Sequence, residues 1–313
     1  MKTRLIGEDG FDSVRHFLRG VFSSPTHWPE WNLVVSRHYD TRFMYFVIES
    51  GGHIHAICPV HEVRDGWRKR FHSGQFHYIP YGGWISDNHP GLSEVSYPLP
   101  VNAMIESFSL PQSGLFSTIG SVTGKCFNTM VNDLRREEEE IWSSCIDAKR
   151  RNMIRKACRC GVSVLYGTDV SDDFYELYST AMARNGLTCL SGQFIKEMAD
   201  LKGEVNFVPF VAYLNGKPSS ALGLVYDKDY AIYWLGATGQ ESAGFGQGEF
   251  LQWEAIRFSK KHGCRYYDLC YTDRERLPRI YEFKKGFSDK EVIVPYYNHK
   301  RLLYKVLSKF SKE

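Results

Sequence analysis

The sequence predicts an α+β protein made of two domains. At 313 residues the chain is longer than one typical compact core. Its composition, with 43% hydrophobic and 24% charged residues, is that of a soluble globular protein. In the second half the expected elements run strand, helices, antiparallel strands, helix and strand, which is not the regular alternation of an α/β fold. We expect the two domains over residues 1–145 and 146–313.

The first half opens with a helix and a hairpin. The pattern of residues 12–22 is helical, and two runs rich in β-branched and aromatic residues flank Ser50-Gly51-Gly52, a hairpin signal. Residues 76–87 follow as a strand that contains Tyr81-Gly82-Gly83. Paired glycines at a strand end let the backbone approach a ligand closely, although an ordinary turn explains them equally well.

The middle of the chain predicts a strand followed by one long helix. Residues 127–134 form the expected strand. Residues 135–161 are acidic in the first turns and basic in the last, as the helix dipole favours, and Gly161 ends the pattern. We place the junction between the domains on or near this helix.

The second half repeats the logic of the first. A short strand at 161–167 and two helices at 172–186 and 191–201 precede three apolar runs over 208–238, which predict an antiparallel meander with short turns. A helix at 248–263 and a strand at 264–271 follow. The matching hairpins of the two halves suggest a diverged duplication of one fold.

Charge and cysteine content narrow the class of protein. A net charge of +3 is mildly basic, weaker than in a dedicated nucleic-acid-binding domain. The N-terminus is acidic where a signal peptide has an apolar core, and no run is long enough to cross a bilayer, so we expect a cytoplasmic protein. Cys158 and Cys160 lack a second pair at zinc spacing, so we expect no metal site.

Five segments carry a family resemblance, in the family's order. They are "YIPYGGWISD" (Tyr78–Asp87), "KRRNMIRKACRCGVSV" (Lys149–Val164), "YWLGAT" (Tyr233–Thr238), "FLQWEAI" (Phe250–Ile256) and "FKKGF" (Phe283–Phe287). Together they resemble the FemAB-like aminoacyltransferases, which build peptide bridges on peptidoglycan precursors in cell-wall biogenesis and belong to the GNAT superfamily. The likeness covers most of the chain and is strongest from about Lys149 onward.

The resemblance implies two tandem GNAT-like domains and an enzyme that moves an aminoacyl group from aminoacyl-tRNA to an amine of a cell-envelope or peptide precursor. It implies no bound cofactor, because aminoacyl-tRNA is a co-substrate. The chain is shorter than the staphylococcal members and has no heptad-patterned helical arm. It is also similar to GNAT-like enzymes of envelope polysaccharide or small-molecule biosynthesis, so an acyl-CoA-dependent N-acyltransferase is the alternative.

The glycine-rich turn before the helix at 248–263 bears on the donor. In a CoA-dependent GNAT enzyme such a turn cradles pyrophosphate, and Gly244, Gly246 and Gly248 only partly fit the usual spacing. A simple flexible turn explains them equally well. Glu249 at the start of the helix would repel a phosphate, which favours tRNA over CoA.

The candidate catalytic residues are Lys284 and Asp268. By resemblance to the family's Phe-Lys motif, Lys284 would face the cleft and contact tRNA phosphates or stabilise the oxyanion, while Phe283 and Phe287 anchor the loop. A solvated surface lysine is the alternative. Asp268 interrupts an apolar strand and could orient the amine or accept its proton. A structural partnership with Arg265 or Arg274 is slightly favoured.

The candidate substrate-binding residues come from several segments. Arg150 and Arg151 lie in a basic cluster that would bind phosphate, or would simply be a solvated helix face. Tyr81 and Tyr233 would offer rings and hydroxyls in the cleft, unless they are core tyrosines. The matched motifs add two more aromatic residues, Phe283 and Trp253.

The C-terminal segment predicts an amphipathic helix. Leu302, Leu303, Val306, Leu307 and Phe310 share one face, and Lys300, Arg301, Lys305 and Lys309 share the other. The helix packs on the core with a wet side or makes a peripheral membrane contact. The partners expected are therefore aminoacyl-tRNA, an amine-bearing precursor and, through this helix, a membrane surface.

Overall fold

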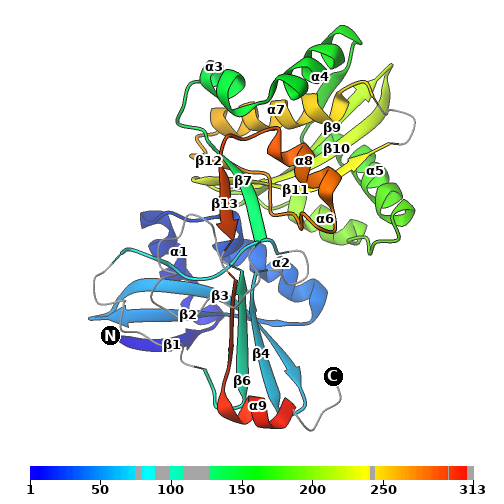
Figure 1. Cartoon of the computed structure of the whole chain (residues 1–313). Helices are drawn as coiled ribbons and strands as arrows, with labels where there is room; N and C mark the ends of the chain where they lie inside the picture. Colours follow the sequence, from blue (N-terminus) through cyan, green and yellow to red (C-terminus); the bar gives the residue numbers. More distant parts are fainter. Residues whose placement is uncertain (75–78, 89–98, 109–126, 240–243, 295, 309–313) are drawn as a thin grey trace. The chain divides into compact units, whose positions relative to one another are not determined.

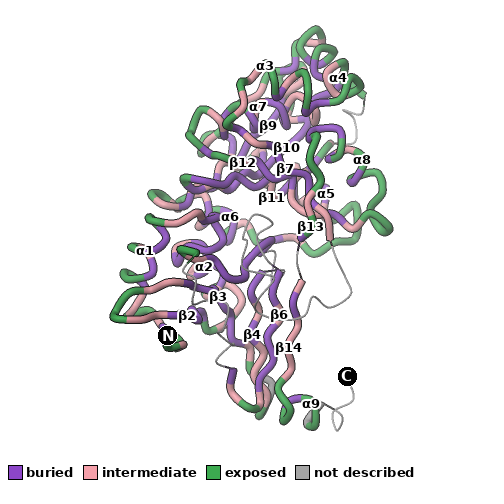
Figure 2. The backbone as a smooth tube through the Cα atoms, turned by 60° about the vertical axis from the view of Figure 1, so that its left-hand side comes forward, coloured by how far each residue is buried: buried purple, intermediate pink, exposed green. Residues whose placement is uncertain are grey.

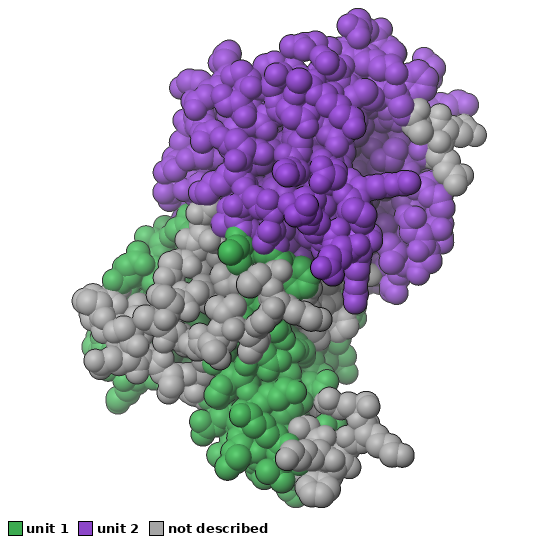
Figure 3. All heavy atoms as spheres, in the orientation of Figure 1, with its two compact units in different colours: residues 1–127, 293–313 green, residues 128–292 purple. Residues whose placement is uncertain are grey.

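The computed structural model describes residues 1–74, 79–88, 99–108, 127–239, 244–294 and 296–308. The chain divides into two compact units, shown in Figure 3. Unit 1 is Met1–Phe127 with Ile293–Glu313, and unit 2 is Asn128–Val292. The boundary therefore differs from the 145/146 junction expected from the sequence. The reason is strand pairing, because the strand after Phe127 joins the sheet of unit 2 and the last strand of the chain joins the sheet of unit 1.

Unit 1 is built on a mostly antiparallel sheet with the order β1-β2-β3-β4-β6-β14, in which β5 also pairs with β3. Its strands and helices are β1 (Lys2–Ile6), α1 (Phe11–Gly20), α2 (Pro29–Tyr39), β2 (Arg42–Ser50), β3 (His53–Asp65), β4 (Arg68–Ser73), β5 (Ile85–Ser86), β6 (Ala103–Phe108), β14 (Tyr296–Lys300) and α9 (Leu302–Ser308). The expected hairpin is confirmed as β2 and β3, with Ser50 opposite His53. The strand β6 was not predicted.

The Tyr81-Gly82-Gly83 segment belongs to the core of unit 1. Tyr81 is fully buried. A Cβ added to Gly82 would lie 2.5 Å from the carbonyl carbon of Ser73, so only glycine fits this approach between two backbone segments. The close approach is thus to the protein's own chain. The expected strand follows the glycines as β5, and residues 76–78 of the predicted range lie outside the described part.

Unit 2 has a sheet with the order β13-β7-β12-β11-β10-β9-β8. Its elements are β7 (Phe127–Asp133), α3 (Glu138–Glu140), α4 (Ala148–Arg159), β8 (Ser163–Tyr166), α5 (Ser171–Arg184), α6 (Gly192–Ala199), β9 (Asn206–Leu214), β10 (Lys217–Tyr226), β11 (Tyr230–Thr238), α7 (Gln247–Lys261), β12 (Tyr266–Asp268), α8 (Pro278–Lys285) and β13 (Glu291–Val294). The predicted meander is confirmed as β9, β10 and β11.

Helices cover both faces of this sheet (Figure 1). On one face, α7 packs on β9 and β10, and Phe258 meets Phe210 edge to face. On the other, α5 and α6 pack on β9 and its neighbours, and Phe174 meets Phe207 edge to face. Residues of β9 alternate between the faces, so Phe207 and Phe210 point to opposite sides. Figure 2 shows the resulting buried centre of unit 2.

The long helix expected over residues 135–161 is interrupted. A π-helical turn, Ile141–Cys145, follows α3, and the backbone is extended at Ile146 and Asp147. The Asp147 carboxylate then accepts a hydrogen bond from the backbone N–H of Arg150, which caps a new helix, α4. Charge patterning alone did not reveal this cap within a run of helix-forming residues.

Within the described residues, no helix is both long enough and apolar enough to span a bilayer. The same part of the chain contains no cluster of metal-ligating side chains. The predicted C-terminal helix is confirmed as α9, whereas the side chains of Leu307 and Phe310, named in that prediction, lie outside the described part.

Candidate active site

The sheet of unit 2 opens between two neighbouring parallel strands. The register of β11 with β12 runs over Tyr230, Ala231 and Ile232, while β11 continues to Thr238. After Asp268 the chain no longer pairs with β11, although the backbone N–H groups of Leu269 and Thr272 still donate to β7. Between them, Cys270 adopts a positive φ of 61°. Such a separation exposes backbone carbonyl and N–H groups of β11 beside a gap, which is where a substrate carbonyl can be held.

Lys284 lies at this opening. It is in the last turn of α8, its residue exposure is 9%, and its Nζ donates a 3.0 Å hydrogen bond to the carbonyl oxygen of Cys270. The same Nζ lies 5.5 Å from the centre of the Tyr233 ring on β11. The side chain therefore spans from one separated strand to the chain that follows the other.

Opposing effects act on the pKa of the Lys284 ammonium. Burial lowers its pKa from the usual 10.5, and the Cys270 thiol and the Asp268 carboxylate act in the opposite direction. The Tyr233 hydroxyl shares this environment, and burial together with the nearby Cys270 raises its pKa to about 12. Tyr233 thus stays a neutral hydrogen-bond donor in the range where the lysine titrates.

Asp268 supports the opening from within the core. Its carboxylate accepts hydrogen bonds from Thr129 Oγ1 at 2.5 Å, from Tyr230 OH at 2.7 Å and from the backbone N–H of Cys270 at 2.6 Å. The residue is 0% exposed. This geometry favours an orienting role over proton transfer, since donors already engage both oxygens.

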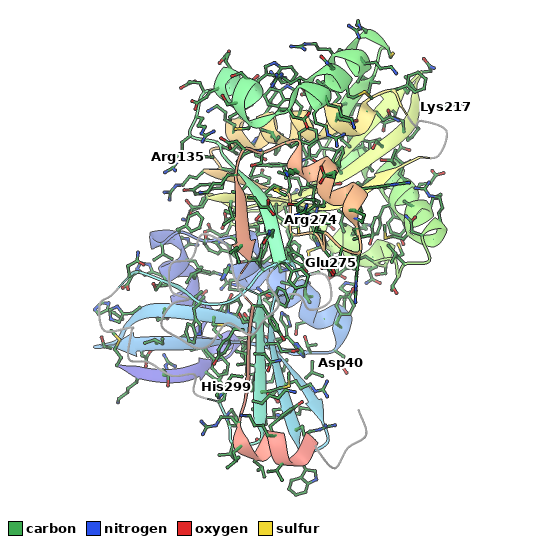
Figure 4. The ribbon with its side chains drawn as sticks, viewed as in Figure 1. Asp40, Arg135, Lys217, Arg274, Glu275 and His299 are labelled. Carbon is green, nitrogen blue, oxygen red and sulfur yellow. The ribbon has the colours of Figure 1, made fainter. Side chains whose placement is uncertain are left out.

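The two arginines suggested as partners of Asp268 make other contacts. Arg265 lies 3.5 Å from Asp229, and Arg274 stacks over the ring of Tyr281 at 5.1 Å. Arg274 and Glu275 belong to the connection from β12 to α8, labelled in Figure 4. The carboxylate is held by neutral donors of its own sheet instead.

A cavity of about 520 Å³ adjoins the opening and lies wholly in unit 2. Elements α4, α5, β10, β11, α7 and α8 contribute its lining. Tyr233 and Phe283 lie in its wall, and two cations that the sequence reasoning missed, Arg184 and Arg279, also line it. Arg184 donates a 3.0 Å hydrogen bond to the carbonyl of Thr238, the last residue of β11. No sequence motif marked either arginine.

The N-terminus of α7 forms one wall of the cavity. Gly246 is its N-cap with a φ of 80°, and a Cβ there would lie 2.2 Å from the carbonyl oxygen of Met153. Lys156 donates a 2.7 Å hydrogen bond to the carbonyl of Gly244. The glycine turn is therefore packed tightly against α4, and the positive φ and close approach both require glycine.

An ion pair fills the first turn of α7. Arg150 Nη1 lies 2.9 Å from Glu249 Oε1, and the two side chains are only 11% and 14% exposed. Arg150 also donates to the carbonyl of Glu282 at 3.2 Å and stacks over the ring of Phe283 at 4.8 Å. Arg150 therefore ties α4, α7 and α8 together. The expected repulsion between Glu249 and a phosphate is moderated by this partner.

The remaining predicted site residues lie elsewhere. Arg151 donates to the carbonyls of Trp142 at 3.3 Å and Ser143 at 3.0 Å, and also to Ile146, which satisfies the end of the π-helical turn. Trp253 is buried and packs 5.0 Å from the ring of Trp142. Tyr81 is buried in unit 1. None of these three is among the described residues that line the cavity, and neither are Lys284, Asp268 and Arg150, which lie behind its wall residues.

Comparison with known proteins bears on the fold. Residues 148–285 match the acetyltransferase (GNAT) domain family. A search of curated proteins found no match. The structure of FemX aligns with a TM-score of 0.74 at 12% identity, covering 100% of both chains. The chain has the tandem GNAT fold shared with FemX.

Two further structures agree. The C-terminal DUF2156 domain assigned to a lysylphosphatidylglycerol synthetase of Agrobacterium fabrum gives a TM-score of 0.58 at 13% identity, over 96% of this chain and 95% of that one. A protein of unknown function from Bacteroides thetaiotaomicron VPI-5482 gives 0.56 at 11% identity, over 95% and 98%. These findings confirm the predicted tandem GNAT-like α+β fold, the resemblance to FemAB-like proteins at the level of fold, and an enzyme of the acyltransferase class.

Proposed function

We propose that the protein transfers an aminoacyl group from aminoacyl-tRNA to a primary amine of a cell-envelope or peptide precursor. The observation that carries the proposal is the buried Lys284 ammonium at the separation of β11 and β12, held between the Cys270 carbonyl and the Tyr233 ring. The shared fold with FemX supports a reaction of this kind. Because charged tRNA occurs inside the cell, the reaction would be cytoplasmic.

The proposed step is a direct acyl transfer. The neutral amine nitrogen attacks the ester carbonyl carbon, a C–N bond forms, and the bond from that carbon to the ribose oxygen breaks. One proton passes from the amine to the departing ribose oxygen. Lys284 stabilises the negative charge that develops on the carbonyl oxygen, and Tyr233 donates from the facing strand. The ester is already activated, so positioning supplies most of the remaining acceleration.

The state of the α7 N-terminus favours tRNA as the donor. In a CoA-dependent GNAT enzyme the pyrophosphate binds where backbone N–H groups at a helix N-terminus are open to it. The Glu249 carboxylate already complements the positive end of α7, and its charge is balanced by Arg150. A pyrophosphate placed there would have to compete with the Glu249 carboxylate for Arg150 and for the positive end of the helix.

The alternative is an acyl-CoA-dependent N-acyltransferase. It is favoured by the match of residues 148–285 to the GNAT acetyltransferase domain and by the two arginines, Arg184 and Arg279, in the cavity lining. The chemistry at Lys284 would be the same, with a thiolate as the leaving group. The two readings differ in the acyl donor that occupies the cavity and therefore in the leaving group.

One pair of assays separates them. Transfer of labelled amino acid from a charged tRNA pool to nucleotide-linked peptide precursors should occur and should be abolished by prior RNase treatment. Acetyl-CoA should not raise the melting temperature. A CoA-dependent rise in melting temperature, with RNase-insensitive transfer, would establish the alternative instead.

A further inference from the structure

One end of the unit 1 sheet exposes a cluster of large apolar side chains. Trp67 is 88% exposed and Leu302 is 79% exposed, and three more apolar residues beside them are exposed: Val101, Leu303 and Val306. Exposed apolar residues are common singly, whereas a cluster of them indicates an interaction surface. We call these five residues the apolar tip.

Strand pairing brings the apolar tip together from three distant parts of the chain. Trp67 lies in the turn between β3 and β4, and the Asn102 side chain donates a hydrogen bond to its carbonyl. The backbone N–H of Lys69 donates to the carbonyl of Asn102 at 3.3 Å, and that of Arg301 donates to the carbonyl of Ala103 at 3.1 Å. The starts of β4 and β6 and the end of β14 therefore lie side by side at one end of the sheet, where α9 begins (Figure 1).

Basic side chains surround the apolar tip. Arg64 and Lys69 flank the β3–β4 turn, Lys300 and Arg301 precede α9, and Lys305 lies within it. The described carboxylate nearest to this group in the strand register is Glu62, which is buried and pairs with Arg64 at 2.5 Å and with Lys69 at 3.9 Å. The side chain of Asp65 lies outside the described part. The surface thus combines apolar side chains with an excess of positive charge.

We propose that this end of unit 1 docks on an anionic membrane surface, with the apolar tip inserted at the level of the lipid headgroups. Tryptophan is favoured at that depth, and clustered Lys and Arg side chains beside it are attracted by anionic headgroups. The sequence indicated only the C-terminal helix. The fold adds Trp67 and Val101, which come from unrelated segments and complete the surface.

The composition of the apolar tip favours lipid over the other occupants. A single-stranded nucleic acid needs aromatic rings on which its bases stack, and four of these five residues are aliphatic. A second copy of this chain would place the same cations against each other around a small apolar contact, which is unfavourable. Acyl chains and anionic headgroups satisfy both components. The proposal is independent of the donor used in the transfer reaction.

Vesicle co-sedimentation of the full-length protein tests the proposal. Vesicles of phosphatidylcholine with about one-third phosphatidylglycerol should bind the protein, and pure phosphatidylcholine should bind it far less. Binding should weaken as ionic strength rises. Trp67→Ser should reduce the affinity about tenfold or more, since it removes a large inserted side chain. Arg301→Gln with Lys305→Gln should reduce it about 25-fold, at about fivefold for each cation.

Matched controls lie on unit 2. Leu165 is 54% exposed and Lys202 is exposed, so Leu165→Ser and Lys202→Gln change an equivalent apolar residue and an equivalent cation away from the tip. Both should bind vesicles as the unaltered protein does. Because all substituted side chains are exposed, circular dichroism and melting temperature should stay unchanged.

Four results would overturn the proposal. The first is no binding to anionic vesicles at low salt, and the second is equal binding by the tip variants and the controls. The third is a loss of tRNA binding in the tip variants when the protein binds no vesicles. The fourth is a dimer in sedimentation equilibrium that depends on Trp67, again without vesicle binding. Difference fluorescence between the unaltered protein and Trp67→Phe adds a direct readout. A blue shift of the Trp67 signal on adding anionic vesicles supports insertion, and an unshifted signal contradicts it.

Discussion

The Nζ of Lys284 donates a hydrogen bond of 3.0 Å to the carbonyl oxygen of Cys270. This contact joins the last turn of α8 to the backbone immediately after β12. Cys270 has a φ of 61°, and its N–H donates to the Asp268 carboxylate, so the position of the accepting carbonyl is fixed from the core. A chain of contacts therefore runs from Asp268 through Cys270 to the ammonium group.

Lys284→Ala should lower the transfer rate by about 10²- to 10³-fold, the range seen when one donor to an oxyanion is removed. The matched control is Lys285→Ala, because Lys285 is the adjacent lysine and is exposed. Single-turnover rates with charged tRNA measure both. Equal rates for the two variants would place the catalytic centre elsewhere.

The transfer rate should fall at alkaline pH. Burial chiefly lowers the pKa of Lys284 from 10.5. As the pH rises, the ammonium therefore loses its proton and its charge before the pH reaches 10.5. Rates measured against pH, corrected for spontaneous ester hydrolysis, should show this alkaline limb. In Lys284→Arg any remaining activity should lack it, because the guanidinium stays charged. If Lys284→Arg shows the same decrease in rate at alkaline pH, that decrease belongs to another titrating group.

Asp268→Asn should destabilise the protein by about 2–3 kcal/mol, because hydrogen bonds to a buried charged acceptor are weakened. It should also move the alkaline limb to lower pH, since the Asp268 charge raises the pKa of Lys284. Glu275→Gln, at an exposed position nearby, is the control and should change stability by less than about 0.5 kcal/mol. Denaturant unfolding and the pH profile provide the two readouts. A normal pH profile in Asp268→Asn would leave the residue a purely structural role.

Sequence patterns predicted the order of elements from β8 to β12 and two aromatic residues of the cavity wall, but not the charges around the cavity. Phe283 and Tyr233, both named from the matched motifs, lie in the cavity wall. Arg150 and Glu249 are 99 positions apart, and their ion pair arises only when α4 packs beside α7. The local sequence of either helix does not indicate which charged side chain of the other helix it will contact.

The misplaced site residues have a common physical cause. Arg151 and Trp253 belong to motifs whose residues alternate around a helix, so only some members face the cavity. Arg151 instead donates hydrogen bonds to carbonyls of the π-helical turn, in a segment for which the sequence pattern predicts continuous helix. The unit boundary was displaced for a similar reason, because strand pairing between distant segments is not visible in local patterns.

His27 should make unit 1 sensitive to acid. Its imidazole is buried, accepts or donates at Ser24 Oγ at 2.8 Å, and lies 3.3 Å from the carbonyl of Gly83. Burial lowers its pKa from 6.5 to about 4. Between these two pH values His27 is protonated in the unfolded chain but neutral in the folded protein. The free energy of unfolding should therefore fall as the pH drops from 6.5 towards 4, by on the order of 3 kcal/mol.

Urea unfolding at several pH values measures this effect. The variant His27→Gln has no imidazole to protonate, so the difference in unfolding free energy between the two proteins should narrow on acidification. A difference that stays constant between pH 7 and pH 4 would mean that folded His27 titrates normally.

The most direct test is mass spectrometry of the reaction products. The full-length protein is incubated with a pool of amine-bearing envelope precursors and either charged tRNA or acetyl-CoA. The account predicts a precursor whose mass has grown by one aminoacyl residue, in the tRNA reaction only, and absent with Lys284→Ala. An acetylated product from the CoA reaction alone, or an aminoacylated product that Lys284→Ala still forms at the full rate, would contradict it.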